Sequence, residues 1–182
     1  MKTLVYIACS LDGNIAKIDG NIDWLTSIPN PENMDYGFNE FMNSVDAILM
    51  GRKTFETVLQ FNEWPYRKPV FVLTSSPKII PVKLREFAEV ITGTPHEILT
   101  QLEDKKFRRI YIDGGKSIQY FLNSNLIDEL IITTIAKIIG DGIKLFENIK
   151  VEEEFEILKA EILNSIMVKI YYKKRNRTTS ST

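Results

Sequence analysis

Residues 109–122 read as a strand that turns through two glycines into a helix, a unit typical of α/β proteins. Residues 110–112 form a short apolar run of β-branched and aromatic side chains, which is typical of a buried strand. Gly114 and Gly115 end this run, and apolar residues then return at helical spacing. Such a turn brings bare backbone N–H groups and a helix N-terminus together, which favours phosphate binding. A tight turn in any α/β protein is the alternative explanation.

A second apolar run, at residues 46–50, ends in Gly51 and is followed by the start of a short helix. Arg52 and Lys53 occupy that start, where the helix dipole disfavours positive charge. A bound anion would reverse this preference, so a phosphate ligand explains the two cations better than folding alone. A solvated basic turn is the other explanation.

A third apolar run, at residues 69–73, ends in Thr74 and Ser75, with no carboxylate at this strand end. Hydroxyl groups before a proline are common in turns, so the absence of an acid is the more informative observation. Dinucleotide sites that choose NAD often place an acid near the adenosine ribose, whereas sites for the 2′-phosphate use cations and hydroxyls. These residues therefore favour the phosphorylated cofactor.

Composition limits the classes of protein that the chain can belong to. Its 182 residues predict one domain, and a net charge of −1 provides no general attraction for nucleic acid or acidic lipid. Cys9 and His96 are the only residues of their types, which excludes an internal disulfide and the usual zinc sites. No apolar run is long enough to span a membrane. We therefore expect a cytoplasmic protein with no metal, nucleic-acid or membrane partner.

The first strand is predicted at residues 4–10, and its apolar residues on both faces indicate a central position in a sheet. Ile15 and Ala16 then resume an extended segment, and residues 17–31 form a loop. Trp24 in this loop is either a hydrophobic plug or a lid over a ligand. Further elements are predicted at residues 89–91 and 130–135 (strands), from Thr94 (a helix with a capping box) and at residues 154–173 (two strands that meet near Asn164).

Residues 31–45 are predicted to form an amphipathic helix, with Asn30 as its N-cap and Pro31 in its first position. Apolar side chains recur at helical spacing from Met34 onward. Asp35 would lie in the first turn, where the helix dipole favours an acid whatever the protein does.

Six segments, taken in order, resemble the dihydrofolate reductase superfamily, and most closely the branch that contains the reductase domain of the riboflavin-biosynthesis deaminase/reductase. They are ACSLDGNIA at residues 8–16, DAILMGRKT at 46–54, LTSS at 73–76, IDGGK at 112–116, DEL at 128–130 and GDGIKLF at 140–146. The last two favour the riboflavin-type branch. A deaminase half would need a zinc site built from His and Cys, which this chain lacks.

The resemblance implies an α/β, single-domain dihydrofolate reductase-like fold over residues 1–174, followed by a polar tail at residues 175–182. A mixed, mostly parallel sheet of about eight strands would be flanked by helices and would have an antiparallel C-terminal edge. The three strand ends described above would then meet at one rim, where the family binds NADPH. A homodimer is a family-level expectation.

The resemblance also implies roles for individual residues. Those expected along the nicotinamide are Ala8, Ile15 and Ala16. Those expected near the phosphates are Gly51, Arg52, Lys53 and Thr54, with Thr74 and Ser75 at the 2′-phosphate and Gly114, Gly115, Lys116 and Ser117 at the pyrophosphate. Those expected to bind the substrate are Trp24, Phe38 and Thr133. The Gly114–Gly115 pair is expected in a conformation closed to other residues, with a cis peptide bond as the form that the family implies.

Asp35 is the expected catalytic residue, because reducing a pterin C=N bond needs a proton as well as a hydride. In dihydrofolate reductases an acid lies at the start of the helix that precedes the Met-Gly-Arg strand, and Asp35 matches that position. Asp23, beside Trp24, is the rival acid.

The expected activity is that of an NADPH-dependent reductase acting on a pterin or on a pyrimidine intermediate of riboflavin synthesis. One alternative is a reductase of the same fold that acts on an unrelated small carbonyl or imine. The other is a nucleotide-binding protein without catalysis. Oxidation of NADPH with each of the two named substrates would separate these possibilities.

Overall fold

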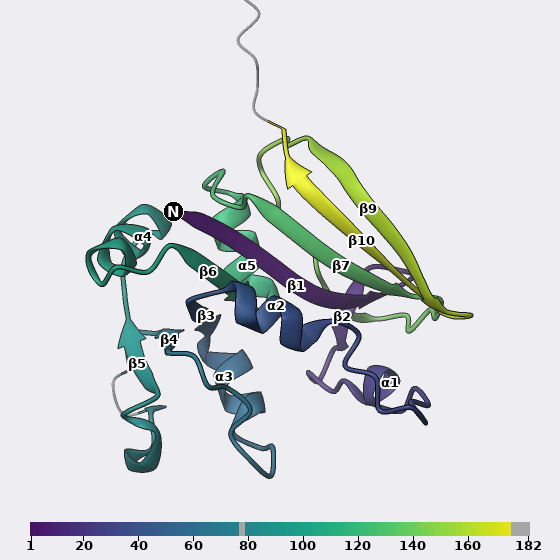
Figure 1. The fold of residues 1–182 in the computed structure, drawn as a ribbon, viewed down its shortest axis with the longest axis horizontal. Coiled ribbons are helices and arrows are strands. Elements are labelled where there is room, and N and C mark those ends of the chain that lie inside the picture. The colour runs from purple at the N-terminus through teal and green to yellow at the C-terminus, as the bar shows by residue number, and fades with distance from the viewer. Residues whose placement is uncertain (77–78, 176–182) are drawn as a thin grey trace, which may run out of the picture.

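The computed structural model describes residues 1–76 and 79–175, and within them one sheet of eight strands dominates the fold (Figure 1). Its strands lie in the order β5-β4-β3-β6-β1-β7-β10-β9. Their bounds are β1 Lys2–Ser10, β3 Ala47–Gly51, β4 Val70–Leu73, β5 Ala88–Ile91, β6 Arg109–Asp113, β7 Glu129–Ile135, β9 Phe155–Asn164 and β10 Met167–Lys174. A separate antiparallel pair joins β2 (Asn14–Lys17) to β8 (Gly142–Lys144).

The strands from β5 to β7 are parallel to one another, and β10 pairs antiparallel with both β7 and β9. The apolar first strand lies between β6 and β7, as its two-faced pattern predicts. Figure 1 shows β5 and β9 at opposite edges of the sheet. The predicted mixed, mostly parallel sheet with an antiparallel C-terminal edge is therefore confirmed.

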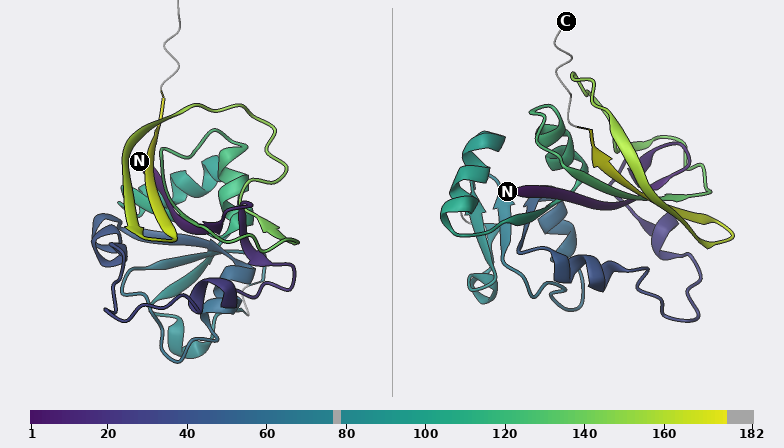
Figure 2. Two further views of the ribbon diagram at one scale, coloured as in Figure 1. Left: turned by 90° about the vertical axis from the view of Figure 1, so that its right-hand side faces the viewer. Right: turned by 45° about the horizontal axis from the view of Figure 1, so that its top comes forward.

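Helices cover both faces of this sheet. The helix bounds are α1 Asp23–Thr26, α2 Phe38–Ser44, α3 Arg52–Val58, α4 Pro95–Asp104 and α5 Gly115–Leu122, with a short 3₁₀ turn at Val82–Leu84. One core cluster joins apolar residues of α4 and α5 to one face, and a second joins residues of α2 and α3 to the other. In Figure 2 the segment that carries α1 lies at the end of the sheet away from the N-terminus.

The helix predicted over residues 31–45 is wrong in its first half. Helix α2 begins only at Phe38, and the residues before it form turns. Asn33, Tyr36 and Gly37 have φ angles of +49°, +52° and +85°, which a right-handed helix cannot contain. The side chain of Met34, which the spacing assigns to the buried stripe, is 52% exposed.

Two smaller expectations meet different outcomes. Helix α4 begins with the predicted capping box, in which Thr94 and Glu97 bond reciprocally. The predicted polar tail lies almost entirely outside the described residues, which end at Arg175.

Among the described residues, no helix is long and apolar enough to cross a membrane.

Candidate active site

The three strand ends that the sequence singles out lie side by side. Strand β3 lies between β4 and β6, and its register places Gly51 opposite Leu73 and Met50 opposite Asp113. Because these strands are parallel, their carboxyl ends form one continuous edge of the sheet. The residues predicted to contact phosphates therefore reach one rim from three separate segments.

Glycines allow the β6–α5 turn to pack against α3. Gly114 has a φ of +87°, and a Cβ added to it would lie 2.1 Å from the Thr54 Oγ1 atom. A Cβ on Gly51 would lie 3.1 Å from the Ser117 Oγ atom. The prediction of a conformation closed to other residues is met at Gly114. The predicted cis bond to Gly115 is wrong, because the described residues contain no cis peptide bond.

The helices at this edge begin at glycines and have no capping side chain. Gly51 precedes α3 and Gly114 precedes α5, and neither glycine has a side chain that could cap its helix. Helix N-termini leave backbone N–H groups without partners inside the helix. These N–H donors are chemically suited to phosphate oxygens, so the residues present fit a phosphate-bearing cofactor.

Cations and hydroxyl groups surround the same edge. Arg52, Lys53 and Lys116 are exposed, and the Arg52 Nε atom lies 3.8 Å from the Glu56 carboxylate one helical turn away. An exposed pair at this distance is weak and leaves most of the guanidinium's donors available. Ser75 is exposed, while the Thr74 hydroxyl accepts a hydrogen bond from the Ser76 N–H at 3.2 Å.

Strands β1 and β2, which flank the turn at residues 11–13, carry the residues expected along the nicotinamide. A Cβ on Gly115 would lie 2.6 Å from the Ile15 Cδ1 atom, so this turn reaches the start of α5. Ala8 is partly exposed on β1, and Ala16 is buried on β2. This contact brings Ile15, one of the predicted nicotinamide residues, next to the predicted phosphate residues.

Asp12 holds this turn in place, a role that the sequence analysis did not assign. Its carboxylate accepts hydrogen bonds from the Ser10 hydroxyl at 2.6 Å and from the backbone N–H groups of Ile139 at 3.2 Å and Gly140 at 2.9 Å. The bond from Ser10, followed by those from the backbone, lowers the pKa of Asp12 to about 2. Asp12 therefore ties the β1–β2 turn to the loop after β7.

Asp113 is a second acid at this edge to which sequence reasoning gave no role. It ends β6 directly before Gly114, and burial raises its pKa to about 6. Hydrogen bonds involving Tyr111, the Gly114 N–H and Tyr66 oppose this rise. The available signal was the acid within the IDGGK segment, but one of its hydrogen-bond partners is Tyr66, a residue far away in the sequence.

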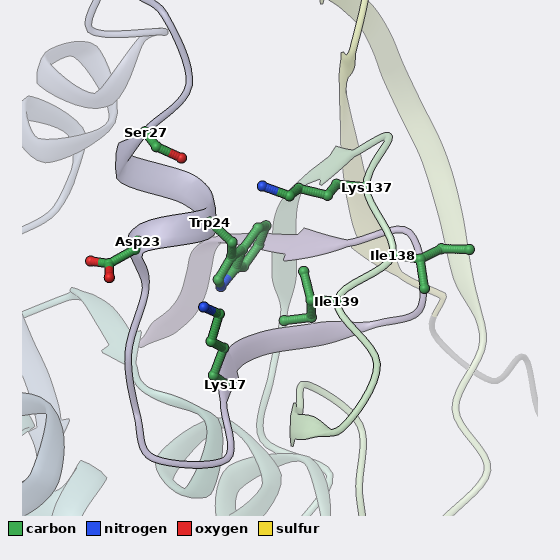
Figure 3. Close-up of a pocket in the computed structure, with 7 residues that line it drawn as sticks. All are labelled: Lys17, Asp23, Trp24, Ser27, Lys137, Ile138 and Ile139. Carbon is green, nitrogen blue, oxygen red and sulfur yellow. The ribbon is translucent and has the colours of Figure 1, made fainter.

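Trp24 lines a pocket of about 280 Å³ beside the β1–β2 turn, together with Lys17, Asp23, Ser27, Lys137, Ile138 and Ile139. Figure 3 shows the Lys17 and Lys137 side chains pointing toward the indole ring. The ring packs on Ile135 and Met167 and is 2% exposed, which is the arrangement of a hydrophobic plug. Its Nε1 atom has no hydrogen-bond partner among the described residues.

Asp35 lies in surroundings that differ from the predicted ones. It is exposed and precedes α2, and its carboxylate accepts hydrogen bonds from the N–H groups of Gly37 at 2.9 Å and Asn39 at 3.0 Å. These bonds lower its pKa. The expected position of Asp35 in the first turn of a helix is therefore wrong, because the left-handed turn at Gly37 delays the start of the helix. The part that Asp35 plays in catalysis stays a prediction, as does that of the exposed Asp23.

The other two predicted substrate residues lie on the face of the sheet that α2 covers. Phe38 begins α2, and its ring centroid lies 5.6 Å from that of Tyr6 on β1. Thr133 on β7 is 8% exposed and pairs with Ala8 in the register of the sheet. Lys169 of β10 is almost fully buried beside them, and the sequence analysis missed it.

Comparisons with known proteins agree with this geometry. The RibD C-terminal domain family matches residues 2–169. The "Uncharacterized protein YwjB" of Bacillus subtilis (strain 168) is 36% identical over 159 residues, which cover 86% of this chain and 88% of that protein. A crystal structure named "Putative riboflavin biosynthesis protein", from Shewanella sp. PV-4, has a TM-score of 0.92 and 40% identity over 97% of this chain and 100% of that one. The predicted resemblance is therefore confirmed.

The fold extends to more distant proteins. Dihydrofolate reductase from Enterococcus faecalis, in complex with NADP(H) and RAB-propyl, has a TM-score of 0.67 at 17% identity, over 96% of this chain and 97% of that one. This likeness shows a common fold, and the predicted dihydrofolate reductase-like fold class is thereby confirmed.

Proposed function

Because the chain belongs to the RibD C-terminal domain family, we propose that it is an NADPH-dependent reductase. Its substrate is a pyrimidine intermediate of riboflavin synthesis or a pterin. The observation that carries the proposal is the edge formed by β4, β3 and β6, where two uncapped helix N-termini and several cations meet. The name of the 40% identical Shewanella protein supports a place in riboflavin biosynthesis.

The phosphate-binding part of the site consists of the β3–α3 and β6–α5 turns. In the proposed complex the backbone N–H groups after Gly51 and Gly114 donate to phosphate oxygens. Arg52, Lys53 and Lys116 balance the phosphate charge. Close packing of Gly114 on Thr54 and of Ser117 near Gly51 holds the two turns in one arrangement, so that little freedom is lost on binding.

The preference for NADPH over NADH follows from the residues near the end of β4. Thr74 and Ser75 supply hydroxyl groups there, and Arg52 and Lys53 supply charge from the neighbouring strand end. A phosphate bound to guanidinium or ammonium groups forms charge-assisted hydrogen bonds, the stronger kind in proteins. The complex of the Enterococcus dihydrofolate reductase with NADP(H) supports the choice of this cofactor for the fold.

The reduced nicotinamide supplies the hydride when it is bound, and the protein supplies orientation and shields the reaction from water. Ala8, Ile15 and Ala16 are proposed to line its ring. On the substrate side we place Phe38 and Thr133 against the ring that is reduced. Trp24 closes the neighbouring pocket, where Lys17 and Lys137 offer charge to an anionic substituent.

The decisive experiment measures NADPH oxidation with two substrates in parallel. These are dihydrofolate and 5-amino-6-(5-phosphoribosylamino)uracil, and one of them should be turned over at a rate that rises with enzyme concentration. NADH should replace NADPH poorly. Tight NADPH binding with no turnover of either compound would contradict the proposed reaction while leaving the cofactor site intact. Absence of NADPH binding would contradict the whole proposal.

A homodimer formed through the edge strand β9 is part of the proposal. Ile157, Leu158 and Ile162 of this strand are 64%, 58% and 84% exposed. A long edge strand with exposed apolar side chains is prone to pair with another chain. Light scattering should therefore show a dimer for the native chain and a monomer for Ile162→Lys.

We also propose a cytoplasmic location, consistent with a single free cysteine, Cys9.

A further inference from the structure

A buried lysine lies in line with the residues proposed to hold the nicotinamide and the substrate. The register of the sheet pairs Ala8 of β1 with Thr133 of β7, and Thr133 with Lys169 of β10. Residues paired across neighbouring strands point to the same face. The three side chains therefore form a row on the face that α2 covers.

The Lys169 ammonium group extends back along this row toward β1. Its Nζ atom lies 5.6 Å from the centroid of the Tyr6 ring and 5.8 Å from that of Tyr171. Tyr6 belongs to β1 and precedes Ala8 by two residues, so it shares the face of Ala8. The Lys169 ammonium group is thus close to the aromatic rings of Tyr6 and Tyr171 and to β1, the strand on which the nicotinamide is proposed to lie.

Lys169 is 2% exposed, yet its charge has few partners. Its Nζ atom donates to the Tyr36 backbone carbonyl, and no carboxylate lies within ion-pair distance among residues 1–76 and 79–175. Burial lowers its pKa, and the more distant Glu161 and Asp35 carboxylates oppose this change. An ammonium group carries three N–H donors, so it retains capacity for further acceptors.

Support of the loop before α2 does not require this charge. The Tyr36 carbonyl already accepts a hydrogen bond from the Tyr6 hydroxyl at 2.8 Å. An uncharged side chain of the same length would fill the space without the cost of burying an ammonium group. A ligand that brings an acceptor to Nζ would offset that cost.

We infer that Lys169 binds the substrate, its ammonium group donating hydrogen bonds to a carbonyl or anionic oxygen of the ring that is reduced. This inference rests on the proposed function for the location of that ring. It makes Lys169 a determinant of specificity: an oxygen-bearing ring such as a uracil is accepted, and a positively charged amino-substituted ring is rejected by like charge.

The test measures the binding of two small rings of opposite charge by calorimetry, with and without NADP⁺. The probes are barbiturate, an anionic oxygen-rich pyrimidine, and 2,4,6-triaminopyrimidine in its protonated form. The native protein should bind barbiturate more tightly. Lys169→Met should weaken barbiturate binding by about tenfold to a hundredfold, the loss expected for hydrogen bonds to a charged group, and should strengthen binding of the cation.

Lys173→Met is the matched control, because Lys173 lies on the same strand and face but is exposed. It should leave both probes and NADPH unchanged, and Lys169→Met should leave NADPH affinity within about twofold. Unchanged barbiturate affinity in Lys169→Met, or a preference of the native protein for the cation, would overturn the inference. The native preference can be measured even where Lys169→Met fails to fold.

Failure of the proposed function has a different signature. In that case the native protein would show no NADPH oxidation with the uracil substrate, while the charge preference and its loss in Lys169→Met would persist. Where turnover is found, Lys169→Met should lower kcat/KM for the uracil substrate by a similar factor. An unchanged kcat/KM would overturn the role of Lys169 and leave the reductase proposal standing.

Discussion

Strands β1 and β6 are parallel neighbours, and each leads into an Asp-Gly pair at the same edge of the sheet. Asp12 and Gly13 follow β1, while Asp113 ends β6 and Gly114 follows it. Both glycines have positive φ angles, of +78° and +87°. The two acids nevertheless have pKa values of about 2 and about 6, on opposite sides of the value for a free side chain.

The difference between the two turns lies in what surrounds them. The Ser10 hydroxyl and the N–H groups of Ile139 and Gly140 all donate to the Asp12 carboxylate, so protein groups stabilise its charge. Asp113 is partly buried beside Tyr66 and Tyr111, and the turn after it leaves the first N–H groups of α5 without a capping side chain. The turn after β1 therefore connects two loops of the protein, and the turn after β6 leaves backbone N–H groups available to a ligand. Acids whose pKa is shifted by burial are often found at functional sites.

The largest expected effect distinguishes the two glycines. Gly114→Ala should weaken NADPH binding by more than about a hundredfold, because the new Cβ would meet the Thr54 Oγ1 atom and push the turns apart. Gly13→Ala bears the same kind of backbone strain, but no atom lies within 4 Å of its added Cβ. It should keep NADPH affinity within about threefold. Fluorescence titration gives the affinities, and circular dichroism confirms that both variants are folded.

Gly115→Ala provides an intermediate case. Its added Cβ would meet the end of the Ile15 side chain, which can rotate away, and Gly115 does not have a positive φ. We therefore expect a smaller loss of NADPH affinity than in Gly114→Ala. Equal effects of the alanine at Gly13 and Gly114 would show that the β6 turn is not a cofactor site.

The next effect concerns the cation beside the β6 turn. Arg52→Ala should weaken NADPH binding by about tenfold to a hundredfold, since a hydrogen bond to a charged group contributes about 1.5–3 kcal/mol. NADH binding should change little. Arg85→Ala is the control. Arg85 is exposed and precedes β5, so it lies at the amino ends of the parallel strands, away from the carboxyl ends where the cofactor is proposed to bind. Equal weakening of both cofactors by Arg52→Ala would contradict its assignment to the 2′-phosphate.

The two acids should give stability profiles of opposite slope. The folded protein binds the Asp113 proton more tightly than the unfolded chain does, so its contribution to the free energy of unfolding falls between about pH 4 and pH 6. Asp12 has a lowered pKa, so its contribution is present above about pH 4 and is lost as the pH falls toward 2. Urea unfolding of Asp113→Asn and Asp12→Asn across this range should remove one slope each.

The size of the Asp113 effect has an upper limit. A pKa of about 6 against an ordinary value of 3.8 corresponds to at most about 3 kcal/mol. Asp113→Asn should therefore gain stability relative to the native protein on going from pH 4 to pH 7. A difference that does not depend on pH would show that the surroundings of Asp113 do not raise its pKa.

More of the cofactor edge than of the substrate side can be predicted from the sequence. Short local patterns, such as the turn at Gly114, predict strand ends, and parallel strands bring those ends together. The burial of Lys169 depends on the register of three strands and on the loop before α2, which no local pattern encodes. The predicted helix start at residue 31 is wrong because the apolar spacing runs from Met34 across Tyr36 and Gly37, and the positive φ angles of these two residues are visible only in the folded chain.

Asp35 resembles Asp12 more than Asp113, and this predicts the smallest effect. Backbone N–H groups of Gly37 and Asn39 donate to its carboxylate and lower its pKa, which keeps it ionised at neutral pH and unsuited to donate a proton. Asn retains one acceptor oxygen and is an equally good cap. Asp35→Asn should therefore lower kcat by less than about threefold with the true substrate, far from the hundredfold or more of lost acid–base assistance, and leave NADPH affinity unchanged. Asp23→Asn, which changes an exposed acid beside the Trp24 pocket, is the matched comparison. A hundredfold fall in Asp35→Asn alone would restore the catalytic assignment that the resemblance implies, and would place Asp35 with the acids whose charge the reaction uses.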